Sequence, residues 1–283
     1  MMKEPRIMKN SCRATFVGCA VLLSCLVPAI ALADPATIDG TYRNGELIRL
    51  TVEGRKAYLI KPTDKVDSQR RWVWVAPWSR AVNDENGNIE HRMYVDRILA
   101  AGFHVAGVDV GTSCGSPKGA EVYQKFYEQL IRDYQLNGKA RLLGQSNGGL
   151  ISYAWAFRHP ECVERIGGIY PATDFRSWPG LEKVLQYPEP ALGYGLSLDE
   201  LTRRSAEFNP IDNLAPLAMV GVKIFHIHGD NDVLVPAEAN TIELVASYKR
   251  LGGDAAWEPF PGLGHGGKVF FQSESLANFL VAD

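Results

Sequence analysis

Residue types that together can cleave the acyl bond of an ester or amide occur at three places in the sequence. The first is a serine between glycines. The pattern Gly-Gln-Ser-Asn-Gly covers residues 144–148 and stands between an apolar, strand-like run and a helical one. Such a turn is sharp enough to strain the serine backbone and expose its hydroxyl. The amide of Asn147, at the start of the helix, would face a developing oxyanion. We therefore predict that Ser146 is a nucleophile, against the alternative of an incidental serine in a glycine-rich turn.

The second and third places supply a base and an acid. A serine hydroxyl becomes a strong nucleophile only when an imidazole takes its proton and a carboxylate orients that imidazole. His265 lies in the glycine-rich loop 262–267, and Asp232 lies in a loop that follows an apolar run. We predict His265 as the general base and Asp232 as the acid. Asp230 and Asp174, which also follow predicted strands, stay open as alternatives for the acid.

A metal site is the competing interpretation of the segment that ends in Asp232. The spacing His-x-His-x-Asp begins at His226 and includes His228 and Asp230. Histidines two residues apart point to the same face of a strand, as in some metal sites. With His265 engaged by the nucleophile, the number of ligands falls short. We expect no metal and no cofactor, and we expect the two strand histidines to hydrogen-bond to the backbone.

The elements that must position these side chains alternate between short apolar runs and longer amphipathic ones. This alternation is typical of a parallel sheet with helices on both faces. Strands are predicted at 48–51, 57–60, 72–76, 103–110, 140–144, 165–170, 223–228 and 256–260, and helices at 90–101, 118–136, 148–158, 237–251 and 268–281. We predict an α/β fold with a mostly parallel central sheet of about eight strands, opened by an antiparallel pair.

Residues 175–220 interrupt the alternation. Prolines and glycines punctuate this segment and leave room only for short helices. We interpret it as a small cap over the carboxyl edge of the sheet, inserted into one domain that covers 34–283. Only two of the five cysteines, Cys114 and Cys162, belong to this domain. The predicted topology separates them too far for a disulfide.

Residues 1–33 have the features of a signal peptide. Four basic residues precede an uncharged apolar stretch, and Ala31-Leu32-Ala33 provides small residues for cleavage after Ala33. An uncleaved membrane anchor and a lipoprotein attached through Cys25 are the alternatives. We predict a secreted or periplasmic protein with no membrane span after signal cleavage.

Composition narrows the possible partners. With 46% hydrophobic and 22% charged residues, the chain can form a globular core. Thirty basic residues against 32 acidic ones give a net charge of −2, without the basic run that nucleic-acid binding requires. We expect a small-molecule or carbohydrate-linked ester as the substrate and no nucleic-acid partner.

Across residues 40–283 the sequence resembles the α/β-hydrolase superfamily. The resemblance rests on the motif at 144–148, on the segment from His228-Gly-Asp-Asn-Asp232 to Pro236, and on Gly264-His265-Gly266. Within it, residues 177–180 and 209–214 resemble exported bacterial hydrolases related to the catalytic domain of prolyl oligopeptidases, often grouped with esterases. The resemblance implies a catalytic triad of Ser146, His265 and Asp232.

The resemblance also implies oxyanion donors from Asn147 and from the loop after the third predicted strand. That loop reads Ala-Pro-Trp-Ser-Arg over 76–80 and lacks the glycine pair of many esterases. Pro77 has no N–H to donate, so the donor is expected to be the Trp78 amide. The side chains of Trp78, Trp178 and Tyr170 are expected to contact the substrate.

These expectations combine into one function and two alternatives. The first is an exported serine hydrolase that cleaves carboxylic esters through an acyl-enzyme. The alternatives are a serine peptidase of the prolyl-oligopeptidase type and a non-catalytic binding protein on the same fold.

Overall fold

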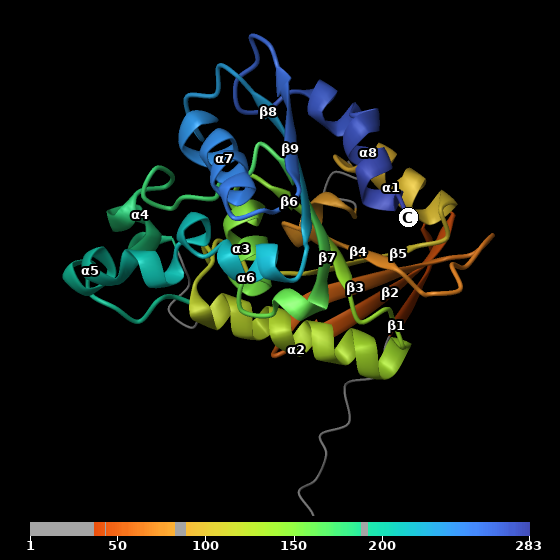
Figure 1. Ribbon diagram of the computed structural model, residues 1–283. Helices are drawn as coiled ribbons and strands as arrows, with labels where there is room; N and C mark the ends of the chain where they lie inside the picture. Colours follow the sequence, from red (N-terminus) through yellow and green to blue (C-terminus); the bar gives the residue numbers. More distant parts are fainter. Residues whose placement is uncertain (1–36, 43, 83–88, 188–191) are drawn as a thin grey trace, which may run out of the picture. The chain divides into compact units, whose positions relative to one another are not determined.

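A nine-stranded sheet runs through the centre of the protein (Figure 1). The computed structural model describes residues 37–42, 44–82, 89–187 and 192–283, with only the backbone at 37–41 and 78. The strands are β1 Thr37–Tyr42, β2 Gly45–Val52, β3 Arg55–Pro62, β4 Trp72–Ala76, β5 His104–Val108, β6 Ala140–Gln145, β7 Val163–Ile169, β8 Lys223–Gly229 and β9 Ala255–Phe260. Their order is β1-β2-β3-β5-β4-β6-β7-β8-β9. The first three pair antiparallel and the last six parallel, so the predicted α/β fold is confirmed, with β1 as an additional strand.

Helices cover both faces of the sheet. They are α1 Arg92–Ala100, α2 Pro117–Tyr134, α3 Asn147–Ala156, α4 Leu181–Gln186, α5 Leu198–Phe208, α6 Ala215–Met219, α7 Glu243–Arg250 and α8 Glu274–Val281. One core contains residues of α2, α3, α6 and α7, and the other contains residues of α1 and α8 (Figure 1). The helix predicted at 268–281 is divided at Ser273, whose hydroxyl accepts from the amide of Leu276 and begins α8.

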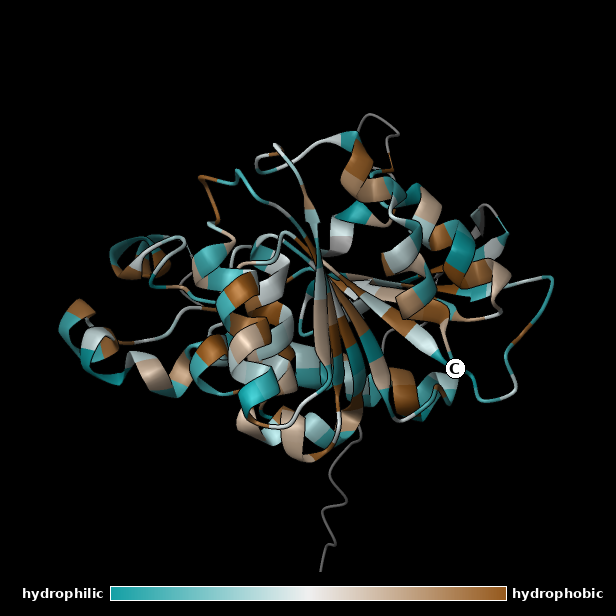
Figure 2. Ribbon diagram, turned by 45° about the horizontal axis from the view of Figure 1, so that its top comes forward, coloured by the Kyte–Doolittle hydropathy of each residue, from teal (hydrophilic) through white to brown (hydrophobic). Residues whose placement is uncertain are grey.

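The alternation of side chains along β4 shows how the sheet joins the two cores. Trp72 and Trp74 belong to the core on one face, and Val73 and Val75 belong to the core on the other. The Trp74 ring stacks on Tyr123 of α2 with centroids 4.3 Å apart. Figure 2 shows the resulting brown apolar stripes on the central strands and on the helix faces that meet them. A strand buried on both faces reads as a continuous apolar run, which is why the sequence predicted β4 well.

The order of the strands creates a switch point between β4 and β6. Strand β4 lies between β5 and β6, and all three are parallel. After β4 the chain continues into α1 on one face, whereas after β6 it continues into α3 on the other. Crevices for ligands form at the carboxyl ends of parallel strands at such a point. The motif at 144–148 lies at this edge, because Gln145 ends β6.

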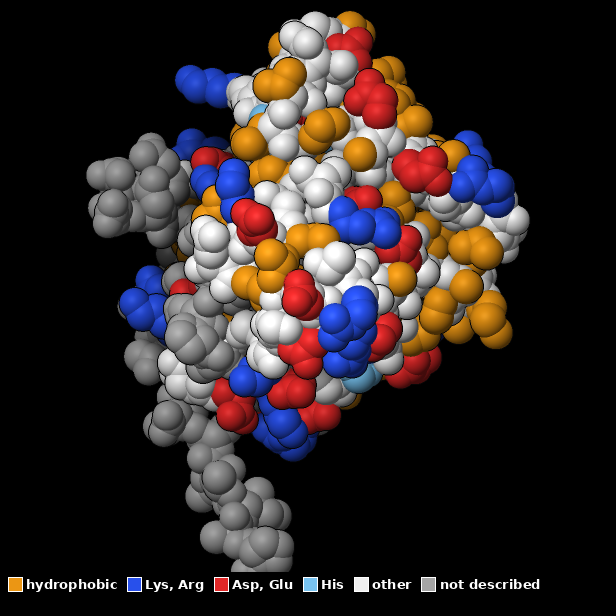
Figure 3. Space-filling view, turned by 90° about the vertical axis from the view of Figure 1, so that its left-hand side faces the viewer, with side chains coloured by type: hydrophobic (Ala, Val, Ile, Leu, Met, Phe, Trp, Pro, Cys, Tyr) orange, Lys and Arg blue, Asp and Glu red, His pale blue; other side chains and the backbone are white. Residues whose placement is uncertain are grey.

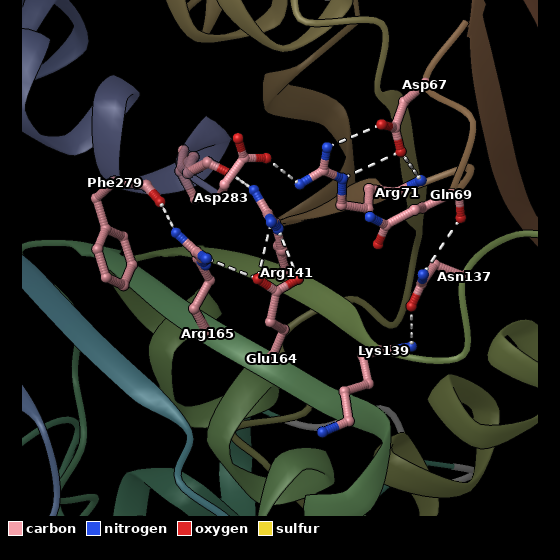
Figure 4. Close-up of polar contacts among 11 residues, drawn as sticks. Asp67, Gln69, Arg71, Asn137, Lys139, Arg141, Glu164, Arg165, Phe279 and Asp283 are labelled. Atoms are coloured by element: carbon pink, nitrogen blue, oxygen red, sulfur yellow. Dashed lines mark hydrogen bonds and ion pairs between the residues drawn. The ribbon is translucent and has the colours of Figure 1, made fainter.

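The opposite, amino-terminal edge of the sheet is held by ion pairs (Figure 4). Arg141 of β6, with a side chain that is 1% exposed, donates from Nε and Nη2 to the two carboxylate oxygens of Glu164, each at 2.8 Å. Arg165 donates to the same carboxylate at 2.6 Å. The two guanidinium groups also donate to the carbonyls of Leu280 and Phe279. These bonds attach α8 to β6 and β7.

The segment between β7 and β8 contains the expected cap. It holds α4 and α5, whose Val184 and Leu201 are buried in a small apolar cluster with Leu150 of α3. Its last helix, α6, departs from this pattern, because Leu217 packs into the main core. Figure 3 faces the side that carries α4 and α5, where acidic, basic and apolar side chains are interspersed.

Three remaining predictions concern the cysteines, the signal peptide and membrane spans. Cys114 and Cys162 are both free, as expected. The predicted signal peptide at 1–33 lies outside the described residues. Among the described residues, no helix is both long enough and apolar enough to cross a bilayer.

Replacing Glu164 by glutamine tests the ion pairs at the amino-terminal edge. Burial raises the pKa of Glu164, but hydrogen bonds from Arg141 and Arg165 outweigh burial and hold the pKa below its usual value. The carboxylate therefore stabilises the fold at neutral pH, and this contribution is lost as acid protonates it. We expect Glu164→Gln to lower the free energy of unfolding by about 3 kcal/mol at pH 7, measured by urea denaturation. Glu207→Gln, which removes an exposed pair with Arg204, is the control and should change little; equal midpoints for both variants would contradict this account.

Candidate active site

Ser146 occupies a strained turn between β6 and α3. Its backbone has φ 51° and ψ −122°, a conformation that L-residues rarely adopt. The turn is possible because glycines flank it. A Cβ on Gly148 would lie 2.2 Å from the Ala76 carbonyl oxygen of β4, and one on Gly144 would lie 2.9 Å from the carbonyl of Gly148. The motif therefore packs β4, β6 and α3 tightly and leaves the Ser146 hydroxyl accessible to a partner.

That partner is His265. Its Nε2 lies 2.9 Å from Oγ of Ser146, and its Nδ1 lies 2.7 Å from Oδ2 of Asp232. Because a carboxylate only accepts, Nδ1 carries the hydrogen and Nε2 is free to accept from the serine hydroxyl. The imidazole also lies against the ring of Tyr170, with centroids 4.4 Å apart. Ser146, His265 and Asp232 thus form one continuous hydrogen-bonded chain.

Asp232 is a buried carboxylate that keeps its charge. Its side chain is 0% exposed. Oδ1 accepts from the backbone amides of Leu234 and Val235 at 3.0 and 2.9 Å, and Oδ2 accepts from His265 and from Nε2 of His228 at 3.1 Å. Burial alone would raise the pKa of Asp232, but the hydrogen bonds from His228, Val235 and His265 outweigh it and lower the pKa to about 2.

The other two carboxylates considered for the acid have different partners. Oδ1 of Asp230 accepts from the backbone amide of Gly262 at 2.6 Å, which ties the loop after β8 to the loop that carries His265. Asp174 pairs with Arg176 at 2.9 Å and accepts from the amide group of Asn209. The structure brings Asp232, and neither of these, to the imidazole of His265.

The histidines of β8 do not form a metal site. Within the described part of the chain, no group of three or more histidine, cysteine or acidic side chains is placed to hold a metal ion. The expectation that they bond to the backbone is largely wrong: His226 contacts the hydroxyls of Tyr153 and Thr241, and His228 contacts Thr241 and Asp232. Only Nε2 of His228 also reaches a carbonyl, that of Val235.

The two backbone amides expected to stabilise an oxyanion lie at the same edge of the sheet as Ser146. Asn147 is the first residue of α3, so its amide has no acceptor within the helix. The close approach of Gly148 to Ala76 brings the end of β4 against this same turn. Residue 78 follows in a short 3₁₀ helix, so its amide belongs to the same edge of the sheet. The expected contact of the Trp78 indole with substrate falls on a side chain outside the described part.

The two other aromatic residues expected to contact substrate are differently placed. Tyr170 is 3% exposed and therefore packs against His265 instead of presenting an open surface. Its hydroxyl accepts from Nε2 of Gln145 at 2.8 Å, and burial raises its pKa to about 12. Trp178 is half-buried and packs against the apolar cluster of the cap. Gln145, which bonds to Tyr170, and His228, which bonds to Asp232, were not predicted as neighbours of the hydrogen-bonded chain, although both lie inside the two sequence motifs.

A hollow of about 920 Å³ lies beside this arrangement. Its lining includes Glu90 and Gly267 but neither Ser146 nor His265. Glu90 lies within 3.5 Å of Gln145, and Gly267 follows His265 by two residues. Charged side chains of both signs, those of Arg92, Asp96, Arg97 and Lys268, complete much of its wall.

Comparison with solved structures finds the same fold in longer peptidases. A puromycin-hydrolysing peptidase of Mycobacterium tuberculosis superimposes with a TM-score of 0.63 at 15% identity, over 84% of this chain and 40% of that one. A putative dipeptidyl aminopeptidase IV of Bacteroides ovatus gives 0.64 at 14%, over 86% and 36%. This chain therefore spans about 40% or less of the length of these peptidases.

A neighbour of similar size also shares the fold. MPT51 of M. tuberculosis gives a TM-score of 0.61 at 14% identity, over 88% of this chain and 98% of that one. No curated protein matches the sequence. The sequence model of the prolyl oligopeptidase family matches residues 121–280, which include Ser146, Asp232 and His265. Because this match covers more than half of the chain, the protein belongs to the prolyl oligopeptidase family of serine hydrolases.

Proposed function

We propose that the protein hydrolyses carboxylic esters through an acyl-enzyme formed on Ser146. The observation that carries the proposal is the chain of two hydrogen bonds, 2.9 Å from Ser146 to His265 and 2.7 Å from His265 to Asp232. A hydroxyl, an imidazole and a carboxylate in this order activate serine for acyl transfer. The strained turn of Ser146 supports the same role, because strain persists where surrounding structure holds it.

The steps follow from the positions of these groups. Oγ of Ser146 attacks the carbonyl carbon while its proton passes to Nε2 of His265. Asp232 stabilises the imidazolium, and the amides of Asn147 and residue 78 stabilise the tetrahedral oxyanion. The C–O bond to the leaving alcohol breaks as His265 returns the proton to that oxygen. Water, deprotonated by His265, then attacks the acyl carbon; the bond to Oγ of Ser146 breaks, His265 returns the proton to Oγ, and the acid is released.

Peptide hydrolysis is the second candidate. The family match and the peptidases that share the fold favour it. An ester is nevertheless the less demanding substrate, because an alkoxide leaves a tetrahedral intermediate more readily than an amine does. A triad that cleaves amides will therefore also cleave activated esters, whereas the reverse need not hold.

The proposal also includes a location and a class of natural substrate. The features of residues 1–33 support export to the periplasm or the medium. Tyr187, exposed on the cap, and Trp178, half-buried there, could contact an aromatic or carbohydrate-linked ester. No cofactor enters the proposed steps.

A substrate panel separates the two candidates. We expect p-nitrophenyl acetate and butyrate to be hydrolysed, and Ser146→Ala to lower kcat by about 10³-fold or more, because the attacking oxygen is removed. Aminoacyl p-nitroanilides in the same assay measure amide cleavage. Hydrolysis of the anilides at comparable kcat/KM would replace the ester proposal by the peptidase one. Ester turnover that Ser146→Ala leaves unchanged would overturn both.

Paired variants of the two neighbouring aspartates identify the acid. Asp232→Asn should lower kcat by about 10⁴-fold, because an amide can donate to Nδ1 and stabilise the wrong tautomer of His265. Asp230→Asn keeps an oxygen that can accept from Gly262, so its kcat should stay within about threefold of the natural protein. Ester assays on both variants measure the difference. A larger loss in Asp230→Asn than in Asp232→Asn would contradict the assignment.

A further inference from the structure

A row of buried polar side chains continues from Asp232 into the interior. Nε2 of His228 lies 3.1 Å from Oδ2 of Asp232, and its Nδ1 lies 2.8 Å from Oγ1 of Thr241. The same hydroxyl lies 3.1 Å from Nδ1 of His226, whose Nε2 lies 2.9 Å from the hydroxyl of Tyr153. His226, His228 and Thr241 are all 0% exposed. Buried polar groups joined in this way constrain one another strongly.

The end of the row at Asp232 fixes where the first hydrogens lie. The Asp232 carboxylate and the carbonyl of Val235 can only accept, and both face Nε2 of His228. Nε2 therefore carries the hydrogen and shares it between the two oxygens. In the neutral imidazole Nδ1 then accepts from the hydroxyl of Thr241.

The hydrogen bonds at the other end of the row, from Thr241 to Tyr153, are consistent with these hydrogen positions. The Thr241 oxygen accepts from Nδ1 of His226, and Nε2 of His226 accepts from the hydroxyl of Tyr153. Burial lowers the pKa of His226 to about 3, so it is neutral. Every hydrogen in the row has an acceptor. A His228 protonated on both nitrogens would reverse the row and leave the Tyr153 hydroxyl with no acceptor among the described residues.

We infer that His228 is a positioning residue for the proposed reaction: it holds Oδ2 of Asp232 toward His265 and shares its negative charge, and Thr241 holds the His228 ring in this orientation. The inference rests on the proposed function. Oδ2 accepts hydrogen bonds from both His265 and His228, so the bond to either imidazole weakens the electrostatic attraction between the carboxylate and the other imidazole. His228 thereby limits how strongly Asp232 stabilises the His265 imidazolium.

Among the described residues, few other charged groups face the imidazole of His265. Tyr170 lies against the ring, and its pKa of about 12 keeps it neutral. Glu90 pairs with Arg80 and reaches the ring only through Gln145 and the Tyr170 hydroxyl. Around His228, the neighbours other than Asp232 are Thr241 and the carbonyl of Val235. Asp232, which both imidazoles contact through Oδ2, is therefore the charged group that touches the His265 ring directly.

Removing the donor should shift the pH dependence of the reaction. In His228→Leu the acid limb of the kcat/KM profile should move to higher pH by about half to one unit, with kcat lowered by about tenfold and KM little changed. His228→Gln retains an N–H at the end of a side chain of similar reach and should restore the limb. A purely structural role would lower activity at every pH without moving the limb, and that result would overturn the inference.

Thr241 provides a second route to the same test should His228→Leu fail to fold. Thr241→Val keeps the shape but removes the hydroxyl, so it should shift the limb in the same direction, and Thr241→Ser should not. Thr173→Val is the matched control, because the Thr173 hydroxyl is buried and has no partner among the described side chains. An unshifted limb in Thr241→Val, or the same shift in Thr173→Val, would overturn the inference.

A measurement without turnover separates this inference from the proposed function. In protein with ¹⁵N-labelled imidazoles, NMR at pH 8 should find His226 and His265 protonated at Nδ1 and His228 protonated at Nε2. Thr241→Val should leave the His228 tautomer in place, because Asp232 and the Val235 carbonyl still accept from Nε2. A single Nδ1–H tautomer of His228 in the natural protein would overturn the inference even if esters are hydrolysed. The predicted tautomers without any hydrolysis would instead overturn the proposed function.

Discussion

The buried charge of Asp232 is the constraint on which the site depends. An ionised carboxylate inside a protein is costly unless hydrogen bonds replace the water it has lost. Four donors do so here, two backbone amides of the turn 234–235 and the imidazoles of His228 and His265. Each of these hydrogen bonds also orients the residue that donates it. The bonds that stabilise the Asp232 charge therefore fix the loop after β8 and the His265 ring that faces Ser146. Stability and chemistry therefore rest on the same bonds.

The sheet separates this site from the groups that secure it. At the carboxyl edge, the turn of Ser146 is strained, and the Gly262 amide donates to Asp230 and so joins the loops of Asp232 and His265. At the amino edge, Arg141 and its partners attach α8 to the strands. A rigid scaffold at one edge allows strain at the other, because the cost of an unfavourable backbone is spread over many buried contacts.

Most of the strands and the three residues of the hydrogen-bonded chain could be predicted from local sequence patterns. The strands from β2 to β9 are short apolar runs, and the Gly-Gln-Ser-Asn-Gly turn, His265 and Asp232 sit in motifs with a mechanical reason for their composition. β1 was missed, because Asp39 and Gly40, residues that strands disfavour, interrupt its six residues. The contact of His228 with Asp232 could not be predicted, since it depends on how Thr241, from a different element, turns the ring. The burial of Tyr170 against His265 could not be predicted for the same reason, because it arises from packing between loops.

The most direct test of the account is where a serine-reactive fluorophosphonate attaches. Intact protein treated at pH 8 and digested should carry the label on Ser146, as located by mass spectrometry. His265→Ala should lose nearly all labelling while keeping its fold, since the hydroxyl then has no base. Label on another serine, or equal labelling of Ser146 without the imidazole, would contradict the claim that these two side chains act together.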